Sequence, residues 1–549
     1  MRGTVIRRIR QGARKLLRDQ RGNAFMLTAA AVVPLIGIVG SAVDIGRAYM
    51  TQLRLQQACD AGVLAGRRSM AGGTYTDAAE AEANKMFNFN FPAGIYGSSG
   101  INFDSQQPST GASDVTGTAH ATLPTALMYI FGKDQFALTA NCTAKLEISN
   151  VDVMLVLDVT GSMRGTRIAG LQTAAKDFFE TLSGADIGDG QLRFGVVPYS
   201  STVNVGQILY NADPSWLSES VTLPSRSGDG WKEVEECGWQ GSKWNREWVC
   251  EKKNRYFYRY ENRTLPVGSI APGSELTFNT GSNGSDETAV WDGCIMERQT
   301  TVFGPSETAP STAFDMDIES SPTSDDATKW KLFLPAFTYD RGRTDPETSS
   351  TDRASLAEYG GDTAACPVAA MKLKKVVEDG TVVSDDEIDE TAFDDYIDDL
   401  EAKGFTYHDV GMAWGARLIS PTGLFASDNA KAEKNDRPIS RHILFMTDGE
   451  MNTPRDNLSH QGLERSLPRI GATDNKDAIA RHNNRFRQLC ERAKRQGITI
   501  WVVSFGVSSN SNLNSCASSG QAYESNDSDE LNENFQAIAR QISKLRLSQ

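Results

Sequence analysis

The stretch from Ala24 to Val43 constrains the fold of this chain most strongly, because it holds twenty consecutive residues without a charge. As a helix, twenty residues span about 30 Å, which matches the hydrocarbon core of a bilayer. Eight Lys and Arg residues precede the stretch within residues 1–21. Because positive charge stays on the cytoplasmic side of a membrane, we expect a single membrane span, a cytoplasmic N-terminus, and the bulk of the chain in the periplasm or outside.

The residues after the apolar stretch bear on whether this anchor is retained. Residues 44–66 have helical character and follow without a strong turn signal, which favours an anchor and continuing helix over residues 24–72, behind a basic cytoplasmic segment at 1–23. Pro34 is tolerated inside a membrane helix. Two alternatives stay open, a cleaved signal segment and a buried helix of a soluble protein.

Charge is distributed unevenly along the 549 residues. The net charge is −14, but residues 1–72 hold twelve Lys and Arg against three Asp and Glu, which leaves −23 for residues 73–549. Nucleic acids select basic surfaces, so the acidic body argues against nucleic acid as a partner.

The eight cysteines fit an oxidising compartment. No CxxC pair occurs and the five histidines are scattered, which argues against a Cys/His zinc site and favours disulfides, with free buried thiols as the alternative. We predict a disulfide between Cys490 and Cys516, which flank the expected strand 498–505. Cys59 and Cys142 remain unassigned.

The hydrophobic pattern divides the rest of the chain into regions. Residues 100–150 hold short β-type runs and predict a small β-rich domain. From residue 151, apolar strands alternate with helices, for example at 168–182, 478–495 and 530–545, which predicts an α/β fold with a doubly wound, mostly parallel sheet. This domain is expected at 151–206 and 401–546. Residues 207–400, rich in Cys and Trp, are expected to form an insertion with a flexible portion.

Two of the expected strands end in acidic residues. VLDVTGS supplies Asp158, Thr160 and Ser162, and LFMTDGE supplies Asp448. One such aspartate is commonly a helix cap. Two at the carboxyl ends of parallel strands, where ligands gather, indicate a site. Carboxylates and small hydroxyls are hard oxygen ligands, which Mg²⁺ and Ca²⁺ prefer.

The D-x-T-G-S sequence at 158–162 resembles the metal-ion-dependent adhesion site of von Willebrand factor type A domains, with Thr160 in place of the commoner serine. In that family paired hydroxyls bind the cation and carboxylates often act through water. The family's threonine matches Thr406 in GFTYHDVGMAWGARLISP, and its last aspartate matches Asp448. The resemblance therefore implies Mg²⁺ (or Ca²⁺ or Mn²⁺) held by Asp158, Thr160, Ser162, Thr406 and Asp448, and a partner that completes the site with an acidic group.

The N-terminal sequence RGNAFMLTAAAVVPLIGIVGSAVDIGRAY, followed by LQQACDAGVLAG, resembles TadE/TadG-type proteins of the tight-adherence (Flp) pilus system. VPYSSTVNVG, VWDGCIMER, AWGARLISP and the closing ELNENFQAIARQISKLRLSQ resemble the members that carry a von Willebrand factor A domain. The resemblance implies an envelope protein, anchored in the inner membrane, whose partners are pilus-assembly or surface proteins. Substrates of prepilin peptidase carry Glu five residues after the cleavage-point Gly, whereas here Leu27 follows Gly22, so processing is not implied.

Other function classes have weaker support. A metal-assisted hydrolase would need a general base, and although His408 or Asp409 near Thr406 could be proposed, neither has a partner at a recognisable spacing. A chelatase-type partner of a ring ATPase is opposed by the membrane span. A cation site that only stabilises a membrane-tethered scaffold stays open. We therefore expect a binding protein and not an enzyme.

Overall fold

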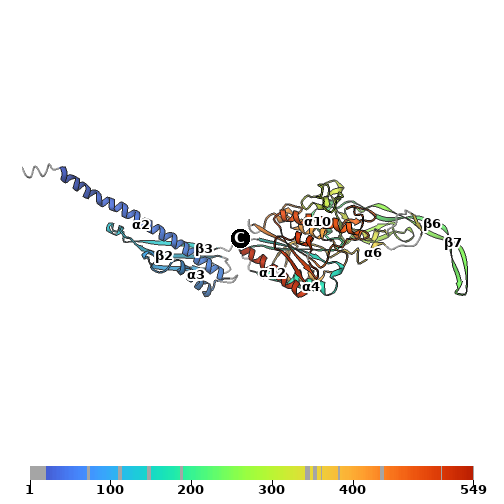
Figure 1. Cartoon of the computed structure of the whole chain (residues 1–549), viewed down its shortest axis with the longest axis horizontal. Coiled ribbons are helices and arrows are strands. Elements are labelled where there is room, and N and C mark those ends of the chain that lie inside the picture. The colour runs from blue at the N-terminus through green and yellow to red at the C-terminus, as the bar shows by residue number, and fades with distance from the viewer. Residues whose placement is uncertain are drawn as a thin grey trace, which may run out of the picture. The chain divides into compact units, whose positions relative to one another are not determined.

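The computed structural model describes residues 20–70, 75–108, 114–144, 150–185, 190–340, 347–349, 355–359, 361–380, 384–432, 438–508 and 510–547. The chain divides into two compact units, residues 1–147 and residues 148–549 (Figure 1). Most of the expected basic segment at 1–23 lies outside the described residues.

The first unit is built on one helix of fifty residues, α2 (Gln20–Ser69), which continues through Pro34. Large apolar side chains of its first half, such as Leu27, Val33 and Ile38, are exposed. From Met26 onward α2 is long and apolar enough to cross a membrane, a property that a signal sequence near an N-terminus would share. The helix is therefore a candidate membrane span.

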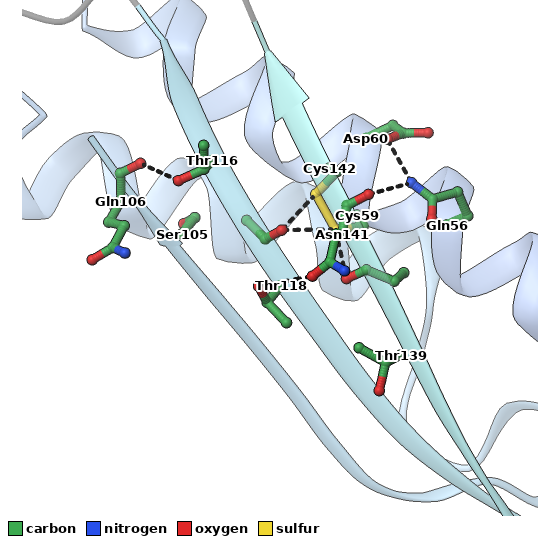
Figure 2. The surroundings of a disulfide bond; sticks show 12 residues. Gln56, Cys59, Asp60, Ser105, Gln106, Thr116, Thr118, Thr139, Asn141 and Cys142 are labelled. Carbon is green, nitrogen blue, oxygen red and sulfur yellow. Dashed lines mark hydrogen bonds between the residues drawn. A yellow bond between two sulfur atoms is a disulfide. The ribbon is translucent and has the colours of Figure 1, made fainter. Parts of the chain in front are cut away.

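The second half of α2 packs against α3 (Asp77–Asn90) and an antiparallel sheet. The sheet has the order β1 (Ser99–Gln106), β2 (Val115–Pro124), β3 (Gln135–Ala144). Residues alternate between buried and more exposed along β2 and β3, as expected for a sheet with one covered face. A disulfide joins Cys59 of α2 to Cys142 of β3, and the Gln56 side chain donates to the Asn141 carbonyl at 2.9 Å (Figure 2). The sheet and α2 therefore share one core.

The second unit is organised by a sheet whose described strands run in the order β14-β13-β5-β4-β15-β18-β19. Neighbouring strands from β5 to β19 are parallel, as are β13 and β14, whereas β13 runs antiparallel to β5. β4 and β5 are buried at every position, as parallel strands covered on both faces are. The strands are β4 (Asn150–Asp158), β5 (Leu192–Tyr199), β13 (Met371–Val376), β14 (Glu387–Ile388), β15 (Ile439–Thr447), β18 (Thr499–Phe505) and β19 (Ala522–Ser525).

Helices cover both faces of this sheet. Val153 and Leu155 of β4 share a core with α4 (Thr166–Ser183), α7 (Glu390–Asp398) and α12 (Ser528–Leu547), which lie on one face. Met154 and Val156 share the opposite core with α8 (His408–Ile419) and α10 (Asn475–Arg495). Figure 1 shows α10 across the sheet from α4 and α12. The second unit is therefore a mixed α/β structure around a largely parallel sheet.

Much of the described part of residues 207–400 packs into this unit. Trp330 and Met316 lie in the same core as Trp414 of α8, so the Ser/Thr/Pro-rich tract around residue 316 is packed, although its backbone is largely irregular. Strands β13 and β14 and helix α7 also come from this range, so the sheet resumes before residue 400. Little in the sequence indicates β13, because its central residues are KLKK.

Smaller elements complete the second unit. They are α5 (Gly206–Ala212), β8 (Glu275–Phe278), β9 (Glu287–Val290), β10 (Ile295–Met296), β11 (Lys331–Leu332), β12 (Glu347–Ser349), α6 (Leu356–Tyr359), α9 (Ala426–Asn429), β16 (Leu458–Ser459), β17 (Gly462–Leu463) and α11 (Ser511–Cys516).

A long hairpin projects from the second unit (Figure 1). It consists of β6 (Ser220–Ser242) and β7 (Asn245–Pro266), paired antiparallel along their whole length. A disulfide joins Cys237 and Cys250 across it, and the exposed rings of Trp239 and Trp248 contact each other, with their centres 5.3 Å apart. Trp244, in the turn between the two strands, is 92% exposed. The hairpin is therefore an arm with an aromatic tip.

All eight cysteines are paired. The predicted disulfide between Cys490 and Cys516 is confirmed and joins α10 to α11. The remaining pairs are Cys59–Cys142, Cys237–Cys250 and Cys294–Cys366.

Candidate metal centre

The predicted site residues lie where three loops meet at one edge of the main sheet. β15 pairs in parallel with β4, with Met446 opposite Leu157, so Asp158 and Asp448 emerge side by side at the strand ends. Thr406 comes from the segment that precedes α8. The order of the strands thus explains how residues distant in sequence reach one place.

Backbone hydrogen bonds hold these three loops together. The amide of Gly161, in the loop after β4, donates to the Gly404 carbonyl at 3.0 Å, and the amide of Lys403 donates to the Val159 carbonyl at 2.8 Å. The amide of Asn452, beyond β15, donates to the Thr406 carbonyl at 3.0 Å. The loop backbones are therefore fixed relative to one another without help from the site side chains.

The five predicted side chains form one hydrogen-bonded network. The hydroxyls of Thr160 and Ser162 lie 2.9 Å apart, and Ser162 Oγ donates to Asp448 Oδ1 at 2.7 Å. Thr406 Oγ1 lies 3.4 Å from Thr160 Oγ1, and Asp158 Oδ1 accepts from the Thr160 amide at 2.9 Å. The structure thus brings all five residues together, although Ser162 and Asp448 are 286 positions apart.

The network is closed on most sides and open on one. Asp158, Thr160 and Asp448 are at most 1% exposed and Thr406 is 5% exposed. Ser162, by contrast, is exposed. Solvent or a ligand therefore reaches the network beside Ser162.

Two carboxylates share this confined space. Burial and the nearby Asp448 carboxylate raise the pKa of Asp158 to about 7. Asp158 Oδ2 accepts from Thr447 Oγ1 at 2.7 Å, and Asp448 Oδ2 pairs with Arg167 at 2.7 Å. Two acidic groups with three hydroxyls form the oxygen-rich donor set that a hard divalent cation prefers, and its charge would offset the carboxylates.

The sequence alone did not indicate Arg167 and Thr447 as partners of the two aspartates. Thr447 directly precedes Asp448, so its position beside the site was readable from the strand end. Arg167 lies in the first turn of α4, and nothing in its sequence context marks it as a partner of a residue that follows β15.

A second group of ligand-type side chains lies in the same unit, namely Asp409, His460 and His482. All three are buried, and their donor atoms lie within 4.8 Å of one another, so the group could hold a metal ion. The histidines are scattered in sequence, but two of them meet in space. His408 points elsewhere, toward Thr447 at 3.0 Å, and burial lowers the pKa of His408 to about 4.

Residues 22–80 match the family of Flp pilus-assembly TadE/G-like proteins. The match covers the candidate membrane helix and the start of α3. A comparison with curated proteins found no match to the sequence.

Several solved structures resemble the chain weakly. The pilus adhesin SpaC from Lactobacillus rhamnosus GG, in its open conformation, is 10% identical with a TM-score of 0.31, over 81% of this chain and 34% of SpaC. The von Willebrand factor domain of the type V pilus tip protein Mfa5 from Porphyromonas gingivalis is 9% identical with a TM-score of 0.30, over 72% of this chain and 95% of that domain. A point mutant of the PilB minor pilin from Streptococcus sanguinis is 11% identical with a TM-score of 0.30, over 81% of this chain and 80% of that pilin.

The chain thus spans about a third of the length of SpaC.

Proposed function

We propose that this chain is an inner-membrane-anchored envelope protein of a Flp/Tad-type pilus-assembly or adhesion system. In this proposal the second unit is a von Willebrand factor A-like domain with a doubly wound sheet. It binds a partner through a divalent cation held by Asp158, Thr160, Ser162, Thr406 and Asp448. The protein is a binding protein and not an enzyme.

One observation carries the proposal. Five oxygen-bearing side chains, selected from the sequence, lie in one hydrogen-bonded network at the ends of two adjacent parallel strands. Ligands of open α/β sheets gather at this edge. The match of residues 22–80 to Flp pilus-assembly proteins supports the cellular setting.

The exposure of the site supports a role in binding a partner. Because Ser162 is exposed while the two aspartates are buried, a cation in the network would face solvent on the side of Ser162. Such a cation keeps coordination positions for water or for an outside group. The chemistry that fits this position best is a carboxylate on the partner.

The experiment compares the full chain, purified in detergent, with its Ser162→Ala variant. Calorimetric titration with Mg²⁺ and Mn²⁺ should show one strong site in the wild type and a loss of affinity of at least about tenfold in the variant. The matched control is Ser183→Ala at the end of the following helix, which should bind like the wild type. Equal binding by Ser162→Ala and the wild type would contradict the site assignment.

A second measurement distinguishes partner binding from a purely structural cation site. The burial of four of the five residues favours the structural alternative. Envelope proteins are captured on the immobilised chain with Mg²⁺, with a chelator, and with Ser162→Ala. Partner binding predicts captured proteins that disappear in the last two conditions. A purely structural cation predicts that chelation lowers the melting temperature and leaves capture unchanged.

A further inference from the structure

Asp409, His460 and His482 come from three separate elements and meet in the interior of the second unit. Asp409 lies in the first turn of α8, His460 in the turn between β16 and β17, and His482 on α10. Their exposed fractions are 2%, 1% and 3%. Asp409 Oδ2 lies 2.7 Å from His482 Nδ1 and 3.3 Å from His460 Nε2. Two imidazole nitrogens therefore converge on one buried carboxylate oxygen.

The surroundings of His460 Nδ1 indicate which nitrogen of the His460 ring carries the proton. Nδ1 of His460 lies 3.4 Å from the carbonyl oxygen of Ser201. A carbonyl can only accept, so this contact favours a proton on Nδ1 and, in the neutral ring, a lone pair on Nε2. That lone pair faces Asp409 Oδ2, which is also an acceptor. Two acceptors at 3.3 Å repel each other unless a cation or an additional proton lies between them.

The other carboxylate oxygen points to the same conclusion. Asp409 Oδ1 is buried and has no hydrogen-bond partner among the described residues. A buried acceptor without a partner is costly, so this oxygen favours a bound cation or a proton. Both oxygens of Asp409 thus have capacity for a ligand, and one of them faces two imidazoles.

We propose that Asp409, His460 and His482 bind a transition-metal ion of the Zn²⁺ class. Two imidazole nitrogens and one carboxylate oxygen are a common ligand set for Zn²⁺ and a poor one for Mg²⁺. Zn²⁺ holds its ligands about 2.0–2.2 Å away, so its donor atoms lie about 3–4 Å apart. The observed spacings, from 2.7 Å up to at most 4.8 Å, bracket this range.

The surroundings are those of a metal-binding histidine pair. A histidine that binds a metal commonly donates the N–H of its second nitrogen to a backbone carbonyl, and His460 Nδ1 lies within reach of the Ser201 carbonyl for such a bond. The Tyr407 ring lies against both imidazoles, with ring centres 5.3 Å from His460 and 5.0 Å from His482. The unpaired Asp409 Oδ1 would supply the fourth donor, and because all three residues are buried such a site would be structural.

The metal would act as a clamp between elements. It would join the start of α8 to α10 and to the β16–β17 turn, and α8 begins two residues after Thr406. Binding an ion only in the folded state stabilises that state. The clamp would therefore hold the segment that delivers Thr406 to the first site.

Metal analysis tests this inference on the full chain, produced without a polyhistidine tag in medium supplied with Zn²⁺. Mass spectrometry should find about one Zn²⁺ per chain in the wild type and in Ser162→Ala, and about tenfold less in His460→Gln/His482→Gln. Wild-type protein without Zn²⁺ would overturn the proposal, since protons then satisfy Asp409. A folded double variant that keeps its Zn²⁺ would overturn it as well.

Cobalt provides a readout that does not depend on the double variant folding. Wild-type chain produced with Co²⁺ should show the visible absorption of four-coordinate Co²⁺, and His482→Cys should keep the ion and add a thiolate charge-transfer band in the near ultraviolet. An octahedral Co²⁺ spectrum, or a band unchanged by His482→Cys, would overturn the assignment. If Ser162→Ala loses Mg²⁺ binding but retains Zn²⁺, the two sites are independent. The proposal for either site can therefore be refuted without refuting the other.

Discussion

Arg167 forms an ion pair with Asp448, so it competes with a bound cation for that carboxylate. Its guanidinium, 39% exposed, pairs with Asp448 Oδ2, while Ser162 donates to the other oxygen of the same carboxylate. A divalent cation in the network would feel this fixed positive charge at close range. The ion pair therefore stabilises the site without a metal and weakens its attraction for one.

The variant Arg167→Gln should bind Mg²⁺ or Mn²⁺ more tightly, by about two- to fivefold, because a partly exposed ion pair contributes about 0.2–1 kcal/mol. Titration calorimetry measures the change. Arg164→Gln is the matched control, since it removes the same charge just before α4 but its partner is the exposed Asp362. Weaker binding by Arg167→Gln than by Arg164→Gln would mean that Arg167 positions Asp448.

At this scale the sequence predicted which residues meet at the strand ends but not their neighbours. Asp158 and Asp448 are readable because each ends an apolar strand, and Thr160 and Ser162 because they follow at fixed spacing. Asp409 and His460 are 51 positions apart, with no shared periodicity, so only the folded chain reveals that they meet. Contacts between elements depend on packing, which a local pattern does not encode.

Glu297 links the long segment after β5 to helix α8 through a buried charge. Its carboxylate accepts from Arg417 at 2.7 Å and from Trp414 at 2.8 Å on α8, and from Trp330 at 3.1 Å. Burial alone would raise the pKa of Glu297, but the Arg417 guanidinium outweighs it and holds that pKa below the ordinary value of 4.5. The ionised form is therefore the one that stabilises the fold.

Glu297→Gln should lower the free energy of unfolding at neutral pH by about 3 kcal/mol, because it leaves the Arg417 charge buried and unpaired. Because the pKa of Glu297 is lowered in the folded protein, its ionised carboxylate stabilises the fold above pH 4.5. That stabilisation is lost as the pH falls through the folded pKa, so the difference in unfolding free energy between variant and wild type should shrink in acid. Denaturant unfolding at about pH 7.5 and about pH 4 measures it. The exposed Glu401→Gln is the control, and a difference that grows in acid would contradict this sign.

Removing two disulfides with different surroundings should affect the stability of the fold differently. Cys490–Cys516 closes a loop of 26 residues between two core helices, and its replacement by serines should cost about 3 kcal/mol of unfolding free energy. Cys237–Cys250 spans an exposed hairpin, so its loss should leave the melting temperature of the core nearly unchanged and speed protease cleavage within 231–256. The opposite ranking in thermal unfolding would contradict the view of the hairpin as an arm.

Long apolar elements were predictable to within a few residues, whereas polar and edge elements were not. The helix expected at 168–182 spans 166–183, and the strand expected at 498–505 spans 499–505. β13 escaped prediction because a strand near the sheet edge needs little apolar sequence, and its lysines are tolerated where one face meets solvent. The arm of β6 and β7 was hidden because it is rich in charged and aromatic residues and has few aliphatic side chains.

For the whole molecule, the proposal requires that the chain beyond the candidate membrane helix lies outside the cytoplasm. The four disulfides agree with such a compartment, and the basic N-terminal residues agree with a cytoplasmic start. An alkaline phosphatase fused to the C-terminus should therefore be active, and a reporter that fluoresces only in the cytoplasm should be dark at the same position. An inactive phosphatase fusion together with a fluorescent reporter fusion would contradict this topology and favour a cytoplasmic role.

The proposed function requires that the loops after β4 and β15, together with the segment before α8, bind one divalent cation. Anomalous diffraction from crystals of the full chain soaked in Mn²⁺ tests this binding most directly. We predict a manganese peak among the side-chain oxygens of Thr160, Ser162 and Asp448, and its absence from Ser162→Ala crystals. Well-diffracting wild-type crystals that show no manganese at this network, or show it only elsewhere, would contradict the proposed cation site.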